Sequence, residues 1–580
     1  MKILGINSFH ADSSACIIID GKIIVAAEEE RFVRIKHYKG FPVLSINFCL
    51  NYCGLKIEDI DEIAINYKLN YNLQKKIFFL ILNFLNIRFW YSKFRNSLNK
   101  KSTKYNLYRF FGCTKNIKVN YVPHHLSHVA SSVLCSGISN GLAISYDGSG
   151  DFSTFEVYSV KENNIKIIKK INFPHSLGIF YQSFTQFLGF HEYGDEYKFM
   201  GLSAYGKNQY VNKVRNLIIF KNGSFKLNLK YFLHQKFIDE SEFASPSPFN
   251  NNLFSNKFIN LFGKPRGKNE IISSRHKNIA YSVQFVFEEN LIRLINYYKK
   301  KTKAQNLYLS GGCAFNSLAN MKILNNIDFQ KVFIQPNAGD AGGALGAALY
   351  ISQLKDKNFV NKKISNMYLG IKESNKEIKR TLDKYFLKNS KFIYTKYSNI
   401  DKLCKVVAIK IKNNNVIAWH QGRAEFGPRA LGNRSILANP SDIKIKNIIN
   451  KKIKLRELFR PFAPSVIDKF ADKYFNLKNS FDYTYMNAVC TVKKNMEKVI
   501  PAVLNIDNTA RIQVVKKKDN IAYYKLLNYF YKLTKIPVLL NTSLNINEPI
   551  SNTSDDTVKT FLNSRIDVLV VENYLITRKQ

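Results

Sequence analysis

The chain opens with MKILGINSFHADSSACIIIDGKIIVAAEEE (residues 1–30), and this stretch decides the fold. Residues 2–7 form an apolar run that predicts a buried strand, and a polar turn follows it. Residues 16–28 predict two more strands, because Gly21 and Lys22 make a hairpin turn between isoleucine-rich segments. The N-terminus therefore predicts strand, polar turn, strand, hairpin turn and strand in succession.

A second segment repeats this order. Residues 142–146 predict a strand, the loop at residues 147–151 (DGSGD) turns, and residues 155–158 predict a returning strand. Actin-like ATPases and sugar kinases consist of two halves that begin in this way, each with ribonuclease-H-like architecture. We therefore expect an α/β fold with a duplicated actin-like domain, although the two segments share little residue identity.

The length and net charge of the chain limit the number of domains and the kinds of partner that we expect. A chain of 580 residues is too long for one ordinary core, so two or more domains are expected. The net charge of +44 suggests an anionic partner, but the lysines are scattered among asparagine and isoleucine without a dense basic tract. We therefore expect no nucleic acid partner, and we expect anionic substrates such as phosphates to be attracted electrostatically.

The cysteines and apolar segments indicate a compartment. The eight cysteines include no CxxC pair, which favours reduced thiols in a cytoplasmic enzyme, and the N-terminus runs into a strand rather than a signal peptide. The apolar run at residues 77–87 is too short to cross a bilayer. The basic, aromatic region 75–110 leaves two alternatives, an interfacial helix that touches a membrane surface or a buried helix or lid.

Three of the ten histidines lie within residues 124–128. On a helix His124 and His128 share one face, about one turn apart, so both imidazoles can bind one metal ion. A carboxylate from the strand that follows can complete the ligand set. The alternative is a helix N-terminus where histidines cap or pack, but the DGSGD loop at the strand end favours the metal.

Two glycine-rich loops follow later in the chain. A predicted buried strand ends at Gly311 and Gly312, and Gly339 precedes an alanine-rich helix. Such glycines permit a nucleotide or phosphate to approach the backbone at a helix N-terminus, although many glycine-rich turns are only tight corners. Asp340 is the stronger candidate, since its carboxylate can reach a metal bound elsewhere.

The C-terminal part has a different character. Residues 355–395 are rich in lysine and asparagine and predict a linker. Beyond them, arginines alternate with glycine, proline and phenylalanine in loops at residues 420–435, 454–465, 507–511 and 538–543. Rigid guanidinium groups suit bidentate capture of phosphate or carboxylate, so these loops predict an anion pocket. The alternative is a set of buried ion pairs with Glu425, Glu457 and Asp507.

Taken together, these motifs resemble the NodU/CmcH-type O-carbamoyltransferase family from one end of the chain to the other. The resemblance implies an actin-like carbamoyl-transfer domain at residues 1–354, a linker at 355–395 and a YrdC-like α/β domain at 396–580. It implies that carbamoyl phosphate and ATP, with Mg²⁺ as its usual companion, give carbamoyl adenylate and pyrophosphate in the second domain. A hydroxyl of a sugar, glycan or natural product then attacks the adenylate in the first domain.

The resemblance also assigns roles to residues. His10 matches the general base for the acceptor hydroxyl, and a histidine suits that role near neutral pH. The ligands of a divalent metal of the iron(II) type match His124, His128, Asp147 and Asp340. The carbamoyl phosphate site matches Arg429, Lys454, Arg460, Arg511, Asn541 and Ser543, with Arg460 also catalytic. The expected nucleotide-binding residues are Gly148, Gly311, Gly312, Asn316 and Gly339.

The chain departs from the family pattern near the second site. Asn505 stands where relatives commonly have histidine, and Asn508 stands where they have glycine. Asparagine tolerates left-handed backbone angles, so we expect the turn at Asn508 to survive. Leu544 and Asn547 also differ from the family pattern, but neither change deletes a charge, and we expect an intact enzyme.

Two other functions compete with this interpretation. A tRNA threonylcarbamoyl-type modification protein would fit the charge but lacks an aromatic RNA platform. An actin-like ATPase or kinase would leave the histidine pair and the arginine-rich loops unexplained.

Overall fold

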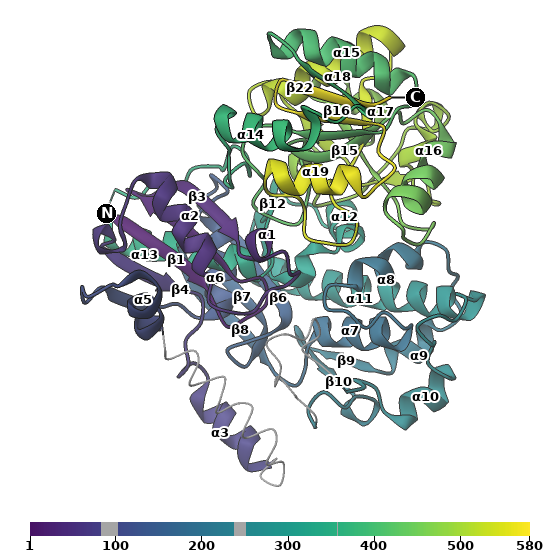
Figure 1. The fold of residues 1–580 in the computed structure, drawn as a ribbon. Helices are drawn as coiled ribbons and strands as arrows, with labels where there is room; N and C mark the ends of the chain where they lie inside the picture. The colour runs from purple at the N-terminus through teal and green to yellow at the C-terminus, as the bar shows by residue number, and fades with distance from the viewer. Residues whose placement is uncertain (83–102, 237–250, 357, 580) are drawn as a thin grey trace. The chain divides into compact units, whose positions relative to one another are not determined.

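A computed structural model describes residues 1–82, 103–236, 251–356 and 358–579, and the chain forms two compact units. The first unit spans Met1–Ile364 and the second spans Ser365–Gln580 (Figure 1). No helix among the described residues is long and apolar enough to cross a membrane. Residues 83–102 of the region considered for membrane contact lie outside the described residues.

The first five-stranded sheet comes from the N-terminal segment and has the order β3-β2-β1-β4-β5. Its strands are β1 (Lys2–Asn7), β2 (Ser14–Ile19), β3 (Lys22–Glu28), β4 (Glu62–Ile65) and β5 (Lys118–Tyr121). β1, β2 and β3 pair antiparallel, whereas β4 and β5 add parallel to β1. The three strands expected within residues 2–28 are confirmed.

The second five-stranded sheet repeats this topology, with the order β8-β7-β6-β11-β12. Its strands are β6 (Gly141–Gly150), β7 (Ser153–Lys161), β8 (Asn164–Asn172), β11 (Asn306–Ser310) and β12 (Lys331–Ile334). The first three again pair antiparallel and the last two add parallel to β6. Equal order and equal strand directions confirm the duplicated actin-like fold.

Two helices bring the halves of this unit together. α6 (His124–Val133) follows β5, and α13 (Asp340–Lys355) follows β12. α13 packs on β1, β2 and α6. A Cβ atom on Gly346 would lie 1.8 Å from the Ser127 carbonyl oxygen, so only glycine permits this crossing. The close approach holds the start of α13 beside α6.

The first unit contains further α-helices among its described residues. They are α1 (Glu30–Val33), α2 (Val43–Cys53), α3 (Leu73–Leu82), α5 (Thr103–Phe111), α7 (Leu177–Phe187), α8 (Glu196–Ser203), α9 (Val211–Arg215), α10 (Asn256–Phe262), α11 (Ser274–Thr302) and α12 (Ser317–Asn326). A small hairpin of β9 (Ile218–Lys221) and β10 (Ser224–Leu227) precedes α10. Phe180, Phe184 and Phe187 of α7 are buried, and the last two pack on Phe258, so these aromatic side chains form core rather than an exposed platform.

The second unit is built on an eight-stranded mixed sheet with the order β13-β22-β21-β14-β15-β20-β16-β19. Its strands are β13 (Phe392–Lys396), β14 (Ile417–His420), β15 (Arg434–Ala438), β16 (Ala463–Ile467), β19 (Gln513–Val515), β20 (Val538–Ser543), β21 (Val568–Val571) and β22 (Tyr574–Arg578). The short strands β17 (Cys490–Thr491) and β18 (Thr509–Ala510) form a separate pair. The α/β class expected for this part is confirmed.

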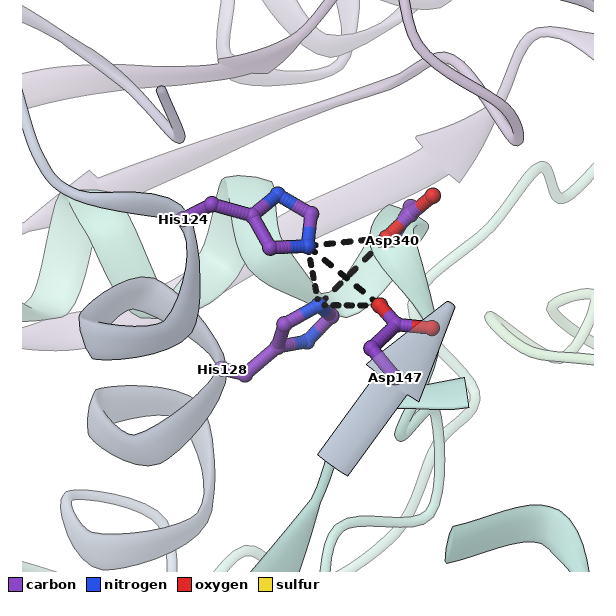
Figure 2. A group of neighbouring side chains, drawn as sticks. All are labelled: His124, His128, Asp147 and Asp340. Atoms are coloured by element: carbon purple, nitrogen blue, oxygen red, sulfur yellow. Dashed lines mark hydrogen bonds and ion pairs between the residues drawn. The ribbon is translucent and has the colours of Figure 1, made fainter. Parts of the chain in front are cut away.

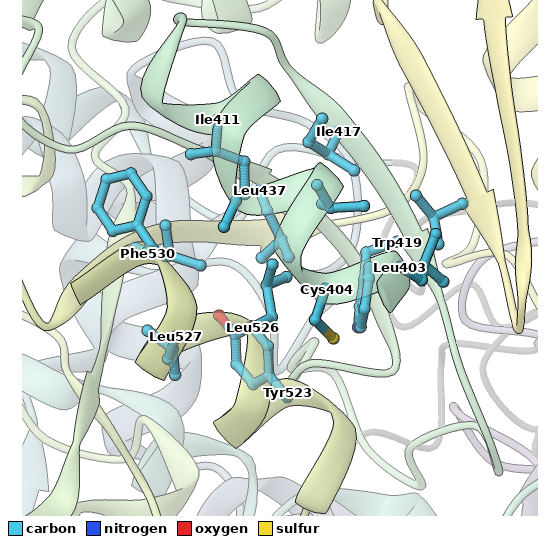
Figure 3. Close-up of a cluster of buried hydrophobic side chains, with 14 of the residues drawn as sticks. Leu403, Cys404, Ile411, Ile417, Trp419, Leu437, Tyr523, Leu526, Leu527 and Phe530 are labelled. Atoms are coloured by element: carbon cyan, nitrogen blue, oxygen red, sulfur yellow. The ribbon is translucent and has the colours of Figure 1, made fainter. Parts of the chain in front are cut away.

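Helices α15 (Ile400–Lys412) and α18 (Ile521–Thr534) cover a buried core on this sheet. Trp419, Tyr523 and Phe530 are its largest members, and Figure 3 shows them with the surrounding aliphatic side chains. The other helices of the unit are α14 (Asn375–Phe386), α16 (Ile443–Ile448), α17 (Ala471–Tyr474) and α19 (Ser554–Leu562).

The structure differs from the expected linker at residues 355–395. α14 begins at Asn375 after a Ser374 cap, and β13 begins at Phe392 and pairs antiparallel with β22. Ile378, Leu382 and Phe386 recur every four residues and are buried, so α14 is an amphipathic helix of the second unit. The many lysines between these apolar positions concealed the pattern, and the boundary between the units falls at residues 364 and 365.

Candidate metal centre and anion pocket

The histidine pair lies at the start of α6, which begins directly after Pro123. His124 and His128 are both buried and point to the same side of the helix (Figure 2). Pro123 supplies no side-chain cap. Instead the Asp151 carboxylate, from the turn between β6 and β7, accepts the His124 backbone N–H at 2.9 Å.

Asp151 connects three segments around this helix start. Its Oδ2 atom also accepts the Lys68 backbone N–H at 2.8 Å, and its own carbonyl accepts from the Asn72 amide at 3.1 Å. A carboxylate at a helix N-terminus is favoured by the unpaired N–H groups and the helix dipole. The sequence drew attention to the DGSGD loop, but it gave no signal for this capping role.

Two carboxylates complete the cluster that the sequence predicted. Asp147 lies near the C-terminal end of strand β6, and Asp340 is the first residue of α13. The Asp147 Oδ2 atom is 3.3 Å from His124 Nε2 and 3.2 Å from His128 Nε2. The Asp340 Oδ1 atom is 3.5 Å and 3.3 Å from the same nitrogens, which are themselves 3.0 Å apart (Figure 2).

This geometry fits a bound metal ion. Ligand atoms of all four residues lie within 4.8 Å of one another. Two ligands each about 2.1 Å from one cation are about 3.0 Å apart at a right angle and about 3.4 Å apart at the tetrahedral angle. Four of the five observed separations fall in this range, and the fifth exceeds it by about 0.1 Å. A set of two imidazoles and two carboxylates suits divalent first-row metals.

The electrostatics of the cluster also suit a cation. Burial, together with the neighbouring His128, lowers the pKa of His124 to about 3, so this imidazole is neutral at pH 7. Burial by itself lowers the pKa of His128, but bonds to Asp147 and Asp340 raise it to about 9. Burial opposes ionisation of Asp147, but both histidines hold its pKa well below the ordinary value. A metal ion would therefore take the place of the proton on His128.

His10 lies beside this cluster, as the sequence predicted. Its Nδ1 atom is 2.6 Å from Asp340 Oδ2, and its ring centre is 5.0 Å from that of His124. The His10 side chain is about one quarter exposed, with 24% of its surface accessible, whereas the four cluster residues are less accessible. Asp340 thus contacts the cluster through one carboxylate oxygen and His10 through the other.

The glycines expected to bind a nucleotide differ in the space around them. A Cβ on Gly312 would lie 2.9 Å from Asp147 Oδ1, and one on Gly311 would clash with the Tyr146 backbone, so this loop abuts the metal ligand. A Cβ on Gly148 would meet nothing within 4 Å. Asn316 instead caps α12 and exchanges amide hydrogen bonds with Gln284, so its side chain serves the fold.

A second group of ionisable residues near His10 was not predicted. Asp12, Glu30 and His37 place one potential ligand atom each within 4.8 Å of the others. The His37 Nδ1 atom is 2.7 Å from Asp12 Oδ1, and its backbone N–H donates to Glu30 at 2.9 Å. Burial by itself lowers the pKa of His37, but Asp12 and Glu30 raise it to about 9, so the group is an ion pair. Only the sequence EEER at residues 28–31 marks this region.

In the second unit, Lys454 and Arg511 lie in different surroundings. The buried Lys454 ammonium donates to the Asn545 side chain at 2.7 Å, to the Asn545 carbonyl at 2.8 Å and to Ser543. Arg511 is also deeply placed, and burial lowers the pKa of its guanidinium to about 10. Within the described part of the chain its Nε atom has no hydrogen-bond partner. Arg511 therefore offers a donor to an anion, whereas Lys454 is used to hold a loop.

Asn541 lies in a polar network that sequence reasoning missed in part. Its amide nitrogen donates to Ser465, Gln513 and the Ala430 carbonyl at 3.0–3.1 Å, which fixes the orientation of the side chain. Among the described residues, the Asn541 Oδ1 atom is buried without a hydrogen-bond partner. Buried polar atoms of this kind indicate a place for a ligand or water.

The alternative of buried ion pairs accounts for little of this region. Glu425 accepts the backbone N–H groups of Leu431 and Asn433, and Asp507 accepts from Thr509. Of the three expected acidic partners, Glu457 contacts an arginine, at 3.5 Å from Arg460.

Asn505 and Asn508, which differ from the family pattern, both fit the local structure. Asn505 donates to the Thr509 hydroxyl at 2.8 Å. Asn508 adopts a left-handed φ of 57°, as expected for an asparagine in place of glycine.

Comparison with known families gives matches in both units. The family model described as Carbamoyltransferase N-terminus matches residues 2–349, and the one described as Carbamoyltransferase C-terminus matches residues 408–578. The two matches together leave out little besides the region in which α14 lies.

Several proteins are similar to the chain over nearly its whole length. An uncharacterized protein of Synechocystis sp. is 36% identical, over 99% of this chain and 96% of its own length. Nodulation protein NolNO of Sinorhizobium fredii is 33% identical, over 99% of this chain and 80% of its own length. Among solved structures, HypF of T. kodakarensis aligns with 61% of this chain and 48% of its own at 13% identity, with a TM-score of 0.32. That structural likeness is too distant to support an argument about this chain.

Proposed function

Because this chain belongs to the carbamoyltransferase family of the NodU/CmcH type, we propose that it is an ATP-dependent O-carbamoyltransferase that modifies a hydroxyl of a sugar, glycan or natural product. One observation carries the proposal. Asp340 contacts the predicted metal cluster through Oδ1 and His10 through Oδ2, so a base for the acceptor lies beside a cation site.

The first half-reaction activates the carbamoyl group in the second unit. Carbamoyl phosphate loses its phosphoryl group to water, which yields carbamate and inorganic phosphate. A carbamate oxygen then attacks the α-phosphorus of ATP, so that carbamoyl adenylate forms and pyrophosphate leaves. Arg511 supports this assignment, since a desolvated guanidinium with an unused Nε donor favours an anion. Asn541 offers a fixed acceptor that suits the carbamoyl amide.

The second half-reaction transfers the group in the first unit. His10 takes the proton of the acceptor hydroxyl at Nε2, because its Nδ1 is bonded to Asp340. The oxygen attacks the carbamoyl carbon, and the bond to AMP then breaks. Asp340 holds the imidazole orientation and stabilises the imidazolium that forms. A divalent ion on His124, His128, Asp147 and Asp340 would supply positive charge near the adenylate phosphate. The absence of a side chain on Gly148 leaves room beside Asp147.

The proposal is tested by measuring phosphate and pyrophosphate release from the purified full chain, with ATP and with or without carbamoyl phosphate. We expect both products to appear together and only with carbamoyl phosphate. Arg511→Met should lower the apparent affinity for carbamoyl phosphate by about 10- to 100-fold, because it removes charged hydrogen bonds. His128→Ala is the matched control and should release pyrophosphate normally.

Other outcomes have defined meanings. Pyrophosphate or phosphate release from ATP that needs no carbamoyl phosphate would overturn the proposal in favour of an ATPase. Equal kinetics for Arg511→Met and the unaltered protein would remove Arg511 from the carbamoyl phosphate site.

A further inference from the structure

A run of the first unit without any acidic residue contains two helices with exposed apolar side chains. The sequence has no aspartate or glutamate between Glu62 and Asp147. Over the same interval it contains many lysines and arginines, among which Lys75 and Lys76 lie on α3 and Lys104 and Arg109 on α5. In a chain that carries 43 acidic residues, this separation of charge gives the segment a net positive charge.

The apolar side chains of α3 divide into an inner and an outer side. Phe79 contacts Phe152 and Phe173 with ring centres 5.5 Å and 5.3 Å away, which anchors the helix to the turn after β6 and the segment after β8. Ile77 and Ile81 are each two residues from Phe79 and therefore lie on the opposite side of the helix. Ile77 is 48% exposed, Phe78 64% and Ile81 60%.

The outer side of α3 forms one continuous stripe. Leu73, Ile77 and Ile81 follow one another at intervals of four residues, which places them along one face, and Phe78 extends that face. Lys75 precedes Phe78 by three residues, so it borders the stripe at its Phe78 edge. On α5, Tyr105 and Tyr108 are each 61% exposed beside Lys104 and Arg109.

We propose that the exposed faces of α3 and α5 bind an anionic lipid surface, with the aliphatic and phenylalanine side chains inserted among the headgroups. Exposed apolar stripes with flanking lysines and tyrosines match the requirements of an interfacial helix, which needs both apolar burial and attraction to negative headgroups. The complete lack of acidic residues over this interval supplies the charge complementarity. A second copy of the chain would meet the same positive charge and be repelled. This inference does not depend on the proposed reaction.

Co-sedimentation of the full-length protein with vesicles tests the proposal. Vesicles of equal parts phosphatidylcholine and phosphatidylglycerol should bind the protein at low salt, whereas vesicles of phosphatidylcholine alone should bind it much less. The double substitution Phe78→Ser and Ile81→Ser should lower the partition coefficient at least about tenfold, because two large apolar side chains no longer leave water. Leu354→Ser, at a 62% exposed position of α13, is the matched control and should bind normally.

A second pair of variants separates this site from the general charge of the chain. Lys75→Glu should weaken binding to the anionic vesicles at least about fivefold, since it reverses a charge beside the apolar stripe. Lys257→Glu changes the net charge equally at an exposed position of α10 and should have no such effect. Circular dichroism and pyrophosphate release should show that all variants remain folded and active.

Three results would overturn the proposal. The first is no sedimentation with anionic vesicles, and the second is equal loss of binding in the α3 variants and their controls. The third is a change in oligomeric state for Phe78→Ser and Ile81→Ser without a change in vesicle binding, which would assign this face to a second copy of the chain.

Discussion

The histidine–aspartate cluster of the first unit and the surroundings of Arg511 in the second unit differ in the charge that each lacks. The cluster lacks a positive charge, and the surroundings of Arg511 lack a negative one. The cluster gathers two imidazoles and two carboxylates within 4.8 Å, so its donor atoms are all bases that face one point. In the pocket, Arg511 is desolvated and its Nε donor has no partner within the described residues. We therefore expect a cation to complete the first site and an anion to complete the second.

This difference also separates residues that complete a site from residues that build it. In the first unit, Asp147 and Asp340 face the cation position, while Asp151 caps the helix that carries the histidines. In the second unit, Arg511 has a donor to offer, while the Lys454 ammonium is enclosed by oxygen atoms of its own chain. Residues of the same charge therefore have different roles, and substitutions can tell them apart.

The largest expected effect comes from removing a ligand of the metal cluster. His128→Ala should lower carbamoyl transfer to the acceptor at least about 100-fold, because it leaves three protein ligands and an incomplete shell. Carbamoyl-dependent pyrophosphate release should continue, since that step belongs to the second unit. Metal content after dialysis, measured by inductively coupled plasma mass spectrometry, should fall in parallel. If His128→Ala retains stoichiometric metal and full carbamoyl transfer, the cluster is not the metal site that this prediction requires.

The next effect concerns stability and compares Lys454 with Arg511. Lys454→Met leaves buried oxygens of Ser543 and Asn545 without their donor, which should cost about 3 kcal/mol of unfolding free energy. Arg511→Met removes a half-buried cation for which the described residues provide no acidic partner, so it should be neutral or stabilising. Urea unfolding followed by Trp419 fluorescence in a Trp90→Phe background reports on the second core. Equal destabilisation by both substitutions would show that Arg511 also serves the fold.

Local patterns in the sequence predicted much of the first unit. The strands within residues 2–28 and 141–158 follow from apolar runs and turn residues that are close in sequence. His124 and His128 are four residues apart, so their shared face is a property of one helix. Asp340 was expected from its place between glycines, but its bond to His10 depends on the packing of α13 on β1, which no local pattern reveals.

The missed features depend on contacts between distant segments. Asp151 and His37 contact residues that are distant in sequence, and the identity of a loop residue does not predict which distant residue it contacts. The expected linker failed for another reason, since the spacing of Ile378, Leu382 and Phe386 was present but diluted by lysines. In the second unit, Lys454 and Arg511 look alike in sequence, and only their surroundings distinguish them.

A smaller effect is expected from Asp151, which contacts the backbone rather than the metal position. Asp151→Asn keeps the shape but removes the negative charge at the start of α6, so the histidines should be held less firmly. Metal affinity, measured by titration calorimetry, should fall about tenfold with little change in stability. Asp61→Asn is the matched control, because Asp61 also accepts a backbone N–H, from Lys2, at a site remote from the cluster. Unchanged affinity in Asp151→Asn would confine metal binding to the four ligands.

The smallest effect concerns pH and the ion pair of His37 with Asp12. The folded-state pKa of His37, about 9, is above its ordinary value of 6.5, so the pair stabilises the fold fully below pH 6.5 and loses that contribution as the pH rises through 9. Both side chains are about one quarter exposed, so water limits the contribution to about 1 kcal/mol. The thermal unfolding midpoint (Tm) of His37→Gln should therefore be lower than that of the unaltered protein at pH 6. The difference between the two Tm values should narrow by pH 9.5. A difference that stays constant over this range would mean that His37 acts through packing against Tyr193 rather than through charge. Asp12 and His37 would then serve the fold, as Lys454 does, and would differ in role from the four residues of the cluster at α6.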